Sequence, residues 1–300
     1  MSDIALKPKA LARVILNPTQ EKRLLAGHNW VFSNEIKEVL AHSEPQPGDI
    51  ALVVTAGGQE LGLAFYHPNS LIAARMLTRS PKDVIDAAFF KKRLAEAIAY
   101  RAKVCPEENA YRLCFGESDG LPGLVIDRYG SVLVLQILCA GIEKRLDIIA
   151  EVLNDLLKPT GIYLKNDHRT RALEGLPLEC RTFSGTVPEK VAIMEGGLRF
   201  CADIGEGQKT GHYFDQRDNR AFLRPYFKGR NVLDLYCYTG GFAINAAKAG
   251  AKSVLAIDSS AAALALAKEN ARLNGVEGAV SFDEGDAEKA GEDGDDQGTD

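Results

Sequence analysis

Residues 231–260 impose the strongest constraint on the fold of this chain. The segment reads NVLDLYCYTGGFAINAAKAGAKSVLAIDSS, which indicates a strand, a glycine turn, a helix and a second strand that ends at an acidic residue. The apolar run 232–235 is typical of a buried parallel strand. Gly240 and Gly241 allow the backbone at the turn to come close to a ligand, because they carry no Cβ. The segment therefore predicts the first half of a doubly wound α/β sheet.

Acidic residues stand where the strands of this unit end. Asp234 lies at the end of the first strand, Asp258 ends the second, and Asp286 follows the strand-like run 279–285. In such folds the acid after the second strand meets the ribose hydroxyls of an adenosine cofactor. We expect Asp258 to do so, Asp286 to lie near the adenine ring, and Asp234 to neutralise an ammonium group. A helix over about 241–249 would point its N-terminal amides at the same ligand.

The glycine pattern distinguishes between cofactors. The dinucleotide fingerprint G-x-G-x-x-G is absent, since YTGGFA has only two adjacent glycines, and a pyrophosphate needs the full glycine turn. S-adenosylmethionine has no phosphate, so the turn favours this methyl donor. A nicotinamide-dependent oxidoreductase is the less favoured alternative. For the glycine pair alone, an ordinary strand–turn–helix without a ligand explains the pattern equally well.

Residues 207–220, GQKTGHYFDQRDNR, form a polar segment directly before this unit. They lack hydrophobic periodicity and hold five charged side chains in fourteen positions. A solvated loop that leads into the helix RDNRAFLRPYF is one explanation. The position immediately before the cofactor strand favours another, a loop that caps a bound ligand.

Short β-rich runs separated by proline and glycine fill the first 80 residues. They predict a small all-β module, a barrel. The expected strands are 12–17, 49–56, 61–67 and 71–77. Apolar positions at helical spacing over 83–103 predict a connecting helix.

A mixed α/β segment follows, with a strongly amphipathic helix at 142–158. Strand-like runs lie on both sides of this helix, and the second and third meet at a tight turn on Gly130. The segment predicts a compact strand–strand–helix–strand–strand domain. The expected strands are 111–116, 121–130, 131–138, 161–167, 190–196 and 198–205.

The distribution of charge is more informative than the total of −5. Residues 275–300 hold ten acids and one base, a net −9, which leaves +4 on the other 274 residues. Residues 1–103 alone carry fourteen bases and ten acids. This mild basic bias is consistent with a phosphate-bearing partner and is weak evidence by itself.

The six cysteines are scattered, without a CxxC pair or a cysteine–histidine cluster. We therefore expect reduced, mostly buried thiols, and neither a disulfide framework nor a metal site. The N-terminus has no hydrophobic signal core, and no run approaches the roughly 20 apolar residues of a membrane span. These features predict a soluble, cytoplasmic protein.

Three motifs together resemble one family. The segment GQKTGHYFDQRDNR with the following VLDLYCYTGGFA is similar to class I methyltransferases of large-subunit ribosomal RNA, the cytosine-C5 enzymes with an N-terminal PUA domain. Residues 26–33, AGHNWVFS, resemble the N-terminal GHxWVF segment of that family, and residues 112–130, RLCFGESDGLPGLVIDRYG, resemble its central signature. The likeness covers about residues 12–289, with the three motifs in the family's order.

The resemblance implies an RNA-binding PUA-like β-barrel, a central α+β domain and a C-terminal Rossmann-like methyltransferase fold that uses S-adenosylmethionine. It also implies a ribosomal RNA substrate and a homodimer. Candidate cofactor-binding residues are Gln208, Lys209, Thr210, Tyr213, Asp215, Gln216, Arg217, Asp234, Tyr238, Thr239, Gly240, Gly241, Phe242, Asp258 and Asp286. Candidate RNA-binding residues are Lys22 and Arg23 for phosphate and Trp30 for base stacking, although a core position in the barrel is slightly favoured for Trp30.

The chain departs from the family where catalysis is concerned. Carbon 5 of cytosine is a poor nucleophile, and enzymes that methylate it usually add a cysteine thiolate to carbon 6. The family carries this cysteine and an Asp-Pro-Pro motif after the third strand, whereas this chain has no DPP and no cysteine after Cys237. Neither Cys201 nor Cys237 is expected to reach a base. We therefore assign no catalytic residue and expect a C-terminally truncated chain without turnover, which leaves a non-catalytic RNA-binding fragment as the alternative.

Further expectations concern the C-terminal half. Strands four to seven of the sheet are missing, so strand 231–236 is predicted to be a bare hydrophobic edge. The last ten residues, GEDGDDQGTD, cannot bury enough surface to offset their ordering entropy and are predicted to be disordered. The target nucleotide cannot be read from these residues. The expected domains are a PUA-like barrel at 1–80, a connecting helix at 81–103, a central α+β domain at 104–205, the first half of a methyltransferase domain at 206–290 and the acidic tail at 291–300.

Overall fold

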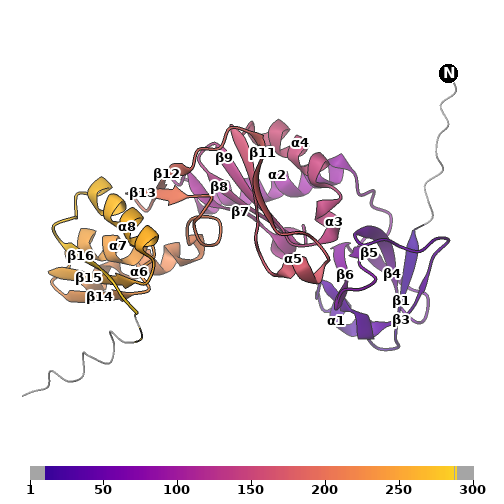
Figure 1. Ribbon diagram of the computed structural model, residues 1–300. Coiled ribbons are helices and arrows are strands. Elements are labelled where there is room, and N and C mark those ends of the chain that lie inside the picture. The colour runs from indigo at the N-terminus through magenta and orange to yellow at the C-terminus, as the bar shows by residue number, and fades with distance from the viewer. Residues whose placement is uncertain (1–10, 287, 289–300) are drawn as a thin grey trace, which may run out of the picture. The chain divides into compact units, whose positions relative to one another are not determined.

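A computed structural model describes residues 11–286 and 288 of the chain, and these form two compact units (Figure 1). The N-terminal unit holds most of residues 11–187. The C-terminal unit holds residues from 188 onward together with two short central segments, 107–111 and 128–130. The predicted disordered tail at 291–300 lies outside the described residues. Within the described part of the chain, no helix has both the length and the apolar character that spanning a membrane requires.

The N-terminal unit begins with a six-stranded mixed sheet in the order β2-β6-β5-β4-β1-β3. All pairings are antiparallel except that of β1 with β4. Its strands and intervening short helices are β1 (Ala12–Leu16), α1 (Glu21–Leu25), β2 (Trp30–Phe32), η1 (Ser33–Glu35), β3 (Ile36–Leu40), β4 (Asp49–Val54), β5 (Glu60–Tyr66) and β6 (Ile72–Thr78). Among the described residues no ladder joins β2 to β3. The described module is therefore a six-stranded sheet whose first and last strands are β2 and β3, and the predicted barrel is not closed by a strand ladder.

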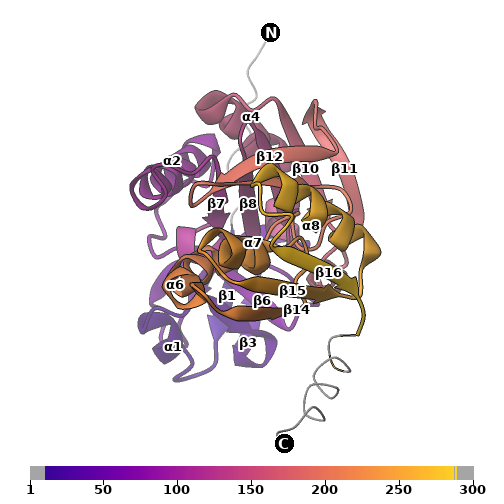
Figure 2. The same ribbon diagram turned by 90° about the vertical axis from the view of Figure 1, so that its left-hand side faces the viewer.

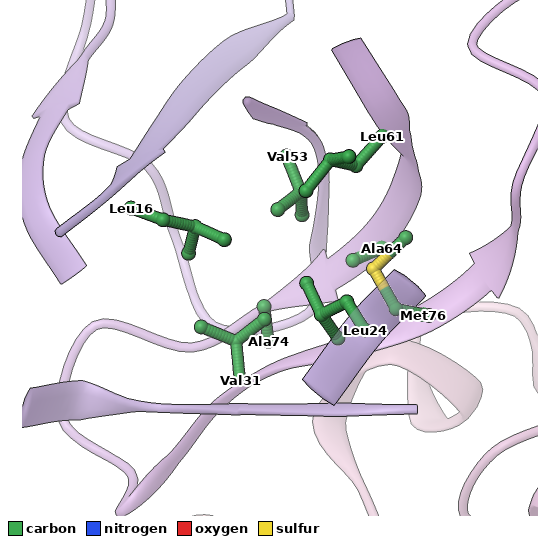
Figure 3. Close-up of a cluster of buried hydrophobic side chains, with 8 residues drawn as sticks. All are labelled: Leu16, Leu24, Val31, Val53, Leu61, Ala64, Ala74 and Met76. Atoms are coloured by element: carbon green, nitrogen blue, oxygen red, sulfur yellow. The ribbon is translucent and has the colours of Figure 1, made fainter. Parts of the chain in front are cut away.

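Four of these strands match the predicted runs, whereas β2 and β3 were missed. β2 has only three residues, which is too short for a period to show. β3 is mostly solvent-exposed and carries two charged residues in five, so it lacks a clear apolar alternation. One apolar cluster of the module is contributed by five strands and by the short helix α1, which supplies Leu24 (Figure 3). Its buried side chains are Leu16, Leu24, Val31, Val53, Leu61, Ala64, Ala74 and Met76.

Helix α2 (Ala87–Val104) follows the first sheet and buries Phe90, Leu94 and Ala97. It begins four residues later than the predicted 83–103, because Asp86 is its N-cap. The Asp86 carboxylate accepts a hydrogen bond from the Phe89 amide at 3.0 Å.

The second sheet has five strands in the order β11-β10-β9-β8-β7. Its elements are β7 (Ala110–Phe115), η2 (Gly116–Asp119), β8 (Leu124–Tyr129), β9 (Val132–Ile137), α3 (Ala140–Glu143), α4 (Leu146–Leu157), β10 (Gly161–Asn166), α5 (Thr170–Leu173) and β11 (Glu179–Gly185). The predicted helix 142–158 is two helices, since Arg145 leaves the helical conformation between α3 and α4. Arg145 instead donates hydrogen bonds from Nη1 to the carbonyls of Gly48 and Gly141.

Within the described residues, strands β12 (Lys190–Glu195) and β13 (Leu198–Asp203) form a ladder only with each other, and they cluster with the C-terminal unit, not with the second sheet. Two asparagines explain why β13 clusters with the C-terminal unit: Asn270 lies in α8 (Ala261–Leu273), and Asn274 is the C-cap of that helix. Asn270 Oδ1 accepts from the Cys201 amide at 2.6 Å, and Asn274 exchanges two hydrogen bonds with the backbone of Arg199. The edge of β13 is thus satisfied by α8. The compact units therefore divide the chain near residue 188, ahead of the predicted boundary at 205.

The remaining elements form a three-stranded parallel sheet in the order β14-β15-β16 (Figure 2). They are η3 (Phe214–Gln216), α6 (Arg217–Phe227), β14 (Asn231–Leu235), α7 (Gly241–Lys248), β15 (Ser253–Asp258) and, after α8, β16 (Val280–Glu284). Helices α7 and α8 pack on one face of the sheet. On the other face, Leu233 is 53% exposed and Leu255 is 36% exposed. No residue of β14 is fully buried, so the expectation of a buried strand at 232–235 is wrong, whereas β14 is the edge strand of the described sheet, as expected.

Candidate cofactor site

The chain leaves β14 through a tight turn at residues 236–241 that requires unusual backbone conformations. Tyr236, Tyr238 and Gly240 have φ of +59°, +48° and +78°. The left-handed region is open to glycine, but a bulky residue held there costs about 1–3 kcal/mol. Hydrogen bonds hold the turn in place, since the Cys237 amide donates to the Ile257 carbonyl at 3.0 Å and the Gly240 amide donates to the Cys237 carbonyl at 2.8 Å.

Asp258, at the end of β15, fixes the same turn from the neighbouring strand. Its Oδ2 accepts from the Tyr238 amide at 2.8 Å, and its Oδ1 accepts from the Ser260 amide at 2.9 Å. Each carboxylate oxygen can accept a second hydrogen bond. Asp258 therefore holds the strained turn and still presents acceptor capacity to the space above it.

Asp234 lies in β14, next to the strand's C-terminal residue, and its carboxylate contacts the first turn of α7. Its Oδ2 accepts from the Ala243 amide at 2.9 Å, which satisfies one of the free amides of the first helical turn. Burial raises the pKa of Asp234 to about 6, with a further rise from Asp258, against the lowering effects of the Ala243 amide and Arg220. The Asp234 carboxyl therefore caps α7, and its burial disfavours the ionised form.

Two tyrosines join the turn to the preceding loop. The Tyr238 hydroxyl accepts from the Gln208 amide at 2.9 Å, and the Tyr213 ring meets the Tyr238 ring edge-on with centroids 5.3 Å apart. Lys209 Nζ lies 4.2 Å from the centre of the Tyr213 ring and 2.7 Å from Asp215 Oδ2. Gln208 and Tyr213 therefore connect this polar segment to the glycine turn, and the prediction that the segment caps a bound ligand stays a prediction.

A buried ionic cluster, the Glu195 cluster, consists of Glu195, His212 and Arg220. Glu195 Oε1 accepts from Arg220 Nε at 2.7 Å, and Glu195 Oε2 accepts from Arg220 Nη2 at 2.6 Å. His212 Nε2 lies 3.0 Å from the same Oε2. All three side chains are 3–5% exposed. Burial alone raises the pKa of Glu195, but hydrogen bonds and charge from His212 and Arg220 outweigh it and hold the pKa at about 2.

These parts surround a cavity of about 460 Å³ at the carboxyl ends of β14 and β15. This volume lies within the roughly 300–1,000 Å³ of small-molecule sites, and the carboxyl ends of strands are where ligands bind in open α/β sheets. The predicted residues that line the cavity are Gln208, Tyr213, Gln216, Tyr238, Thr239, Gly241, Phe242 and Asp258. Lining residues that were not predicted are His212, Arg220, Tyr236, Cys237 and Ser259.

Other predicted residues do not line the cavity. They are Lys209, Thr210, Asp215, Arg217, Asp234, Gly240 and Asp286. Thr210 is fully buried, with Oγ1 3.1 Å from the Tyr129 hydroxyl, and Asp286 is exposed, with Oδ1 accepting from the Glu288 amide. Gly240 provides the left-handed N-cap of α7. Thr210 is thus a buried residue of the loop, Asp286 is a surface residue, and Gly240 is part of the turn.

Glu195 is the residue that sequence reasoning had least chance of finding. It ends β12 and lies 25 positions before Arg220, in a run that reads only as a strand. His212 and Arg220 do belong to the polar segment 207–220, but nothing in its pattern separates them from their neighbours.

The three candidate RNA-binding residues lie close together in the N-terminal unit. Lys22 is exposed. Arg23 donates to Glu35 Oε1 at 2.6 Å and lies over the Phe32 ring. Trp30 is half-buried, and its indole Nε1 donates to Glu117 Oε1 at 2.6 Å. Trp30 therefore connects the first sheet to η2 and is not one of the buried residues of the sheet's apolar clusters, so neither the core position nor the stacking role predicted for it is established.

The burial of the cysteines matches the expectation that most of them are buried. Four of the six are buried, Cys201 is half-buried, Cys180 is exposed, and none of the six forms a disulfide. Cys237 is the one cysteine of the chain that lines the cavity. Burial, then Asp234 and Asp258, raise the pKa of its thiol to about 12, so it is not a thiolate at neutral pH.

Comparison with known proteins agrees with this geometry. Residues 14–79 match the model of a PUA-like domain, and residues 132–291 match that of S-adenosylmethionine-dependent methyltransferases. The ribosomal RNA large subunit methyltransferase I of Shewanella denitrificans is 41% identical over 281 residues, which cover 92% of this chain and 70% of the relative. The three motifs noted in the sequence thus belong to a continuous likeness.

Solved structures show the same fold. A protein from Streptococcus mutans, described as a proposed SAM-dependent methyltransferase, superposes with a TM-score of 0.81 at 20% identity, covering 94% of this chain and 73% of that one. A proposed methyltransferase in complex with SAH gives a TM-score of 0.81 at 21% identity, covering 94% of this chain and 72% of that one. At such identities the likeness concerns the fold alone.

Proposed function

From the premise that this chain belongs to the S-adenosylmethionine-dependent methyltransferase family, with a PUA-like N-terminal domain, we propose that its substrate is large-subunit ribosomal RNA. The proposal is supported by the relative from Shewanella denitrificans, whose name gives that activity. The basic bias of residues 1–103 and the exposed Lys22 are compatible with contact to RNA phosphates. Lys22 and Arg23 are proposed as phosphate contacts. For Trp30 we propose a contact through its exposed part only.

One observation supports the site assignment above all others: the cavity at the carboxyl ends of β14 and β15 is lined by both the glycine turn and Asp258. Its size suits an adenosine-based ligand. Asp258 keeps acceptor capacity for ribose hydroxyls, because its two hydrogen bonds use one lone pair on each oxygen. When bound there, S-adenosylmethionine supplies an electrophilic methyl group.

The chain's own residues would orient this donor. We propose that Tyr213, Tyr238 and Phe242 pack against it and that Gln208 and Gln216 offer amide hydrogen bonds from the cavity wall. Thr239 and Gly241 belong to the turn that lines the cavity. The other predicted cofactor residues act through the loop and turn that they stabilise, and Asp286 is retained as a proposed contact near the adenine.

We further propose cytosine carbon 5 as the methylated position, together with absence of turnover in these 300 residues alone. Methylation there needs a thiolate that adds to carbon 6. Cys237 is the one cysteine at the cavity and stays protonated, and the chain has no DPP motif to hold a base. The alternative function, RNA binding without catalysis, is favoured for the isolated chain by this lack of a nucleophile.

Titration calorimetry and a transfer assay test these proposals separately. We expect binding of S-adenosylmethionine and of a ribosomal RNA fragment, and no binding of NAD. Tritium transfer from labelled donor to ribosomal RNA is expected to stay at the level of a no-enzyme blank, and transfer above that level would contradict the absence of turnover. Binding of RNA without the donor would overturn the site assignment and leave the non-catalytic alternative. A homodimer is also proposed, and light scattering would reveal a monomer instead.

A further inference from the structure

The central signature at residues 112–130 does not line the cofactor cavity, but it contributes an exposed aromatic ring to the surface of the N-terminal unit. Phe115 ends β7 and is 51% exposed, and Tyr100 of α2 is 58% exposed. An arginine covers each ring from one side. Arg112 Cζ lies 5.2 Å from the centre of the Phe115 ring. Arg101 Cζ lies 5.1 Å from the centre of the Tyr100 ring. We call these four side chains the α2–β7 platform.

Two carboxylates hold the arginines in one orientation. Arg112 donates from Nε and Nη2 to the two oxygens of Asp127 at 2.9 Å each, and Asp127 is fully buried. Arg101 donates from Nη1 and Nη2 to the two oxygens of Asp119. Such bidentate pairs fix the plane of a guanidinium as well as its position. Each arginine therefore gives its aromatic ring a fixed support.

Asp119 also connects the two halves of the α2–β7 platform. Its Oδ2 accepts from the Phe115 amide at 2.6 Å, in addition to Arg101 Nη2 at 2.8 Å. Arg101 Nε donates to the Arg112 carbonyl at 3.2 Å. These hydrogen bonds join the strand β7 to the C-terminal part of α2. The two rings therefore have set positions before a partner binds, which reduces the entropy lost on binding.

Basic side chains lie on the same side of α2 as Tyr100. Lys103 is exposed three positions after Tyr100, and Arg93 is half-buried seven positions before it, spacings that place residues on one face of a helix. A Cβ added to Gly120 would lie 3.3 Å from the guanidinium of Arg93, so Arg93 borders the C-cap of η2. Glu96 lies 3.8 Å from Arg93 and offsets its charge, whereas Lys103 extends the basic side of the rings. An exposed lysine beside aromatic rings favours a polyanion over a protein partner, because lysine is depleted in protein–protein interfaces.

We propose that the α2–β7 platform binds single-stranded RNA, with bases stacked on the exposed faces of Phe115 and Tyr100. The inference rests on the proposed function, because it assumes that the substrate of the chain is RNA. Aromatic rings stack on bases of any sequence, and nearby basic side chains contact the backbone phosphates. Bases of a duplex are already stacked on one another, so a duplex gains nothing from these rings. The platform therefore selects unpaired segments of the RNA and contacts them outside the cofactor cavity.

The test compares a short single-stranded fragment of large-subunit ribosomal RNA with the same fragment paired to its complement. Fluorescence anisotropy of the labelled RNA, titrated with the full chain, gives a dissociation constant for each form. Phe115→Leu and Tyr100→Leu keep an apolar side chain at these exposed positions but remove the ring. We expect each variant to bind the single strand about tenfold more weakly, which is the size of one lost base stack, and to bind the duplex as the wild type does. The ratio of the two constants within one variant cancels any difference in the folded fraction.

A matched control comes from α6, which carries another pair of exposed aromatic residues. Phe222 and Tyr226 are more exposed than the rings of the α2–β7 platform, and their ring centroids lie 5.8 Å apart. Phe222 belongs to the C-terminal unit, so Phe222→Leu should leave both dissociation constants unchanged. Where duplex binding is too weak to measure, a circular dichroism spectrum identical to that of the wild type shows that a ring variant is folded.

Each result supports or overturns the proposal. Unchanged single-strand binding in both ring variants overturns it and leaves the proposed RNA substrate intact. Equal weakening of single-strand and duplex binding also overturns it, because lost stacking affects unpaired bases alone, and so does an equal effect of Phe222→Leu. A changed oligomeric state in light scattering, at unchanged RNA affinity, overturns it in favour of a second copy of the chain on this face. A wild type that binds neither RNA overturns the proposed function, and this inference with it.

Discussion

Replacement of Glu195 by alanine should destabilise the C-terminal unit by about 3 kcal/mol. The magnitude follows from the pKa of Glu195, which the Glu195 cluster lowers from 4.5 to about 2. At about 1.4 kcal/mol for each pKa unit, this shift corresponds to about 3 kcal/mol by which the cluster stabilises the ionised form of Glu195 relative to the protonated form. Removal of one partner of a buried ion pair costs a similar roughly 3–5 kcal/mol, because the other charge remains buried and unpaired.

Hydrogen exchange followed by mass spectrometry measures this locally, which suits a chain of more than one compact unit. Peptides from β12, β13 and α6 should exchange about a hundredfold faster in Glu195→Ala than in the wild type. Glu269→Gln is the control, since the ion pair of Glu269 with Lys190 is largely exposed and such pairs contribute about 0–1 kcal/mol. If both variants accelerate exchange by less than about tenfold, the cluster does not stabilise the unit as reasoned.

The pH dependence of the wild type gives a second measurement of the same energy. Because the folded-state pKa of Glu195 lies below its unfolded value, its contribution is complete above about pH 5 and is lost as the pH falls toward 2. Stability of the C-terminal unit should therefore fall more steeply between pH 5 and pH 3 in the wild type than in Glu195→Ala. Parallel pH profiles would argue against an ionised Glu195 in the folded protein.

Three further predictions concern other parts of the chain. Asp234→Asn should stabilise the C-terminal unit by about 1–3 kcal/mol at pH 8 and not at pH 4, because burial raises the carboxyl pKa to about 6 and the ionised form is penalised above it; exchange of β14 and α7 peptides at both pH values tests this. Glu117→Ala should shift the emission of Trp30, the single tryptophan, to longer wavelength, and an unchanged spectrum would contradict the contact. Lys22→Gln should lower the salt dependence of ribosomal RNA binding by about one phosphate contact, whereas an unchanged slope removes it from the interface.

The regular parts of the fold could be predicted from the sequence because they follow local patterns. The helix and strand after the glycine turn were predicted to within a residue or two, since apolar period and turn residues are read over a few positions. The break between α3 and α4 has no such signal. It depends on hydrogen bonds from Arg145 to carbonyls as distant as Gly48, and a helical pattern over 142–158 cannot show a competing partner elsewhere in the chain.

The residues of the candidate site likewise fall into those that a local pattern predicts and those that depend on tertiary contacts. Asp258 could be identified because its position at a strand end is a property of the sequence, and the structure gives its carboxylate both a role in the turn and a place at the cavity. Arg220 was not predicted because its position at the cavity depends on Glu195, which accepts hydrogen bonds from two of its guanidinium nitrogens and lies 25 positions earlier in the chain. The turn at Tyr238, with φ of +48°, is held both by the local hydrogen bond from the Gly240 amide to the Cys237 carbonyl and by Asp258, 20 positions along the chain. Strand ends and glycines therefore indicate where such a cavity lies, whereas the buried charges in its wall are set by tertiary contacts.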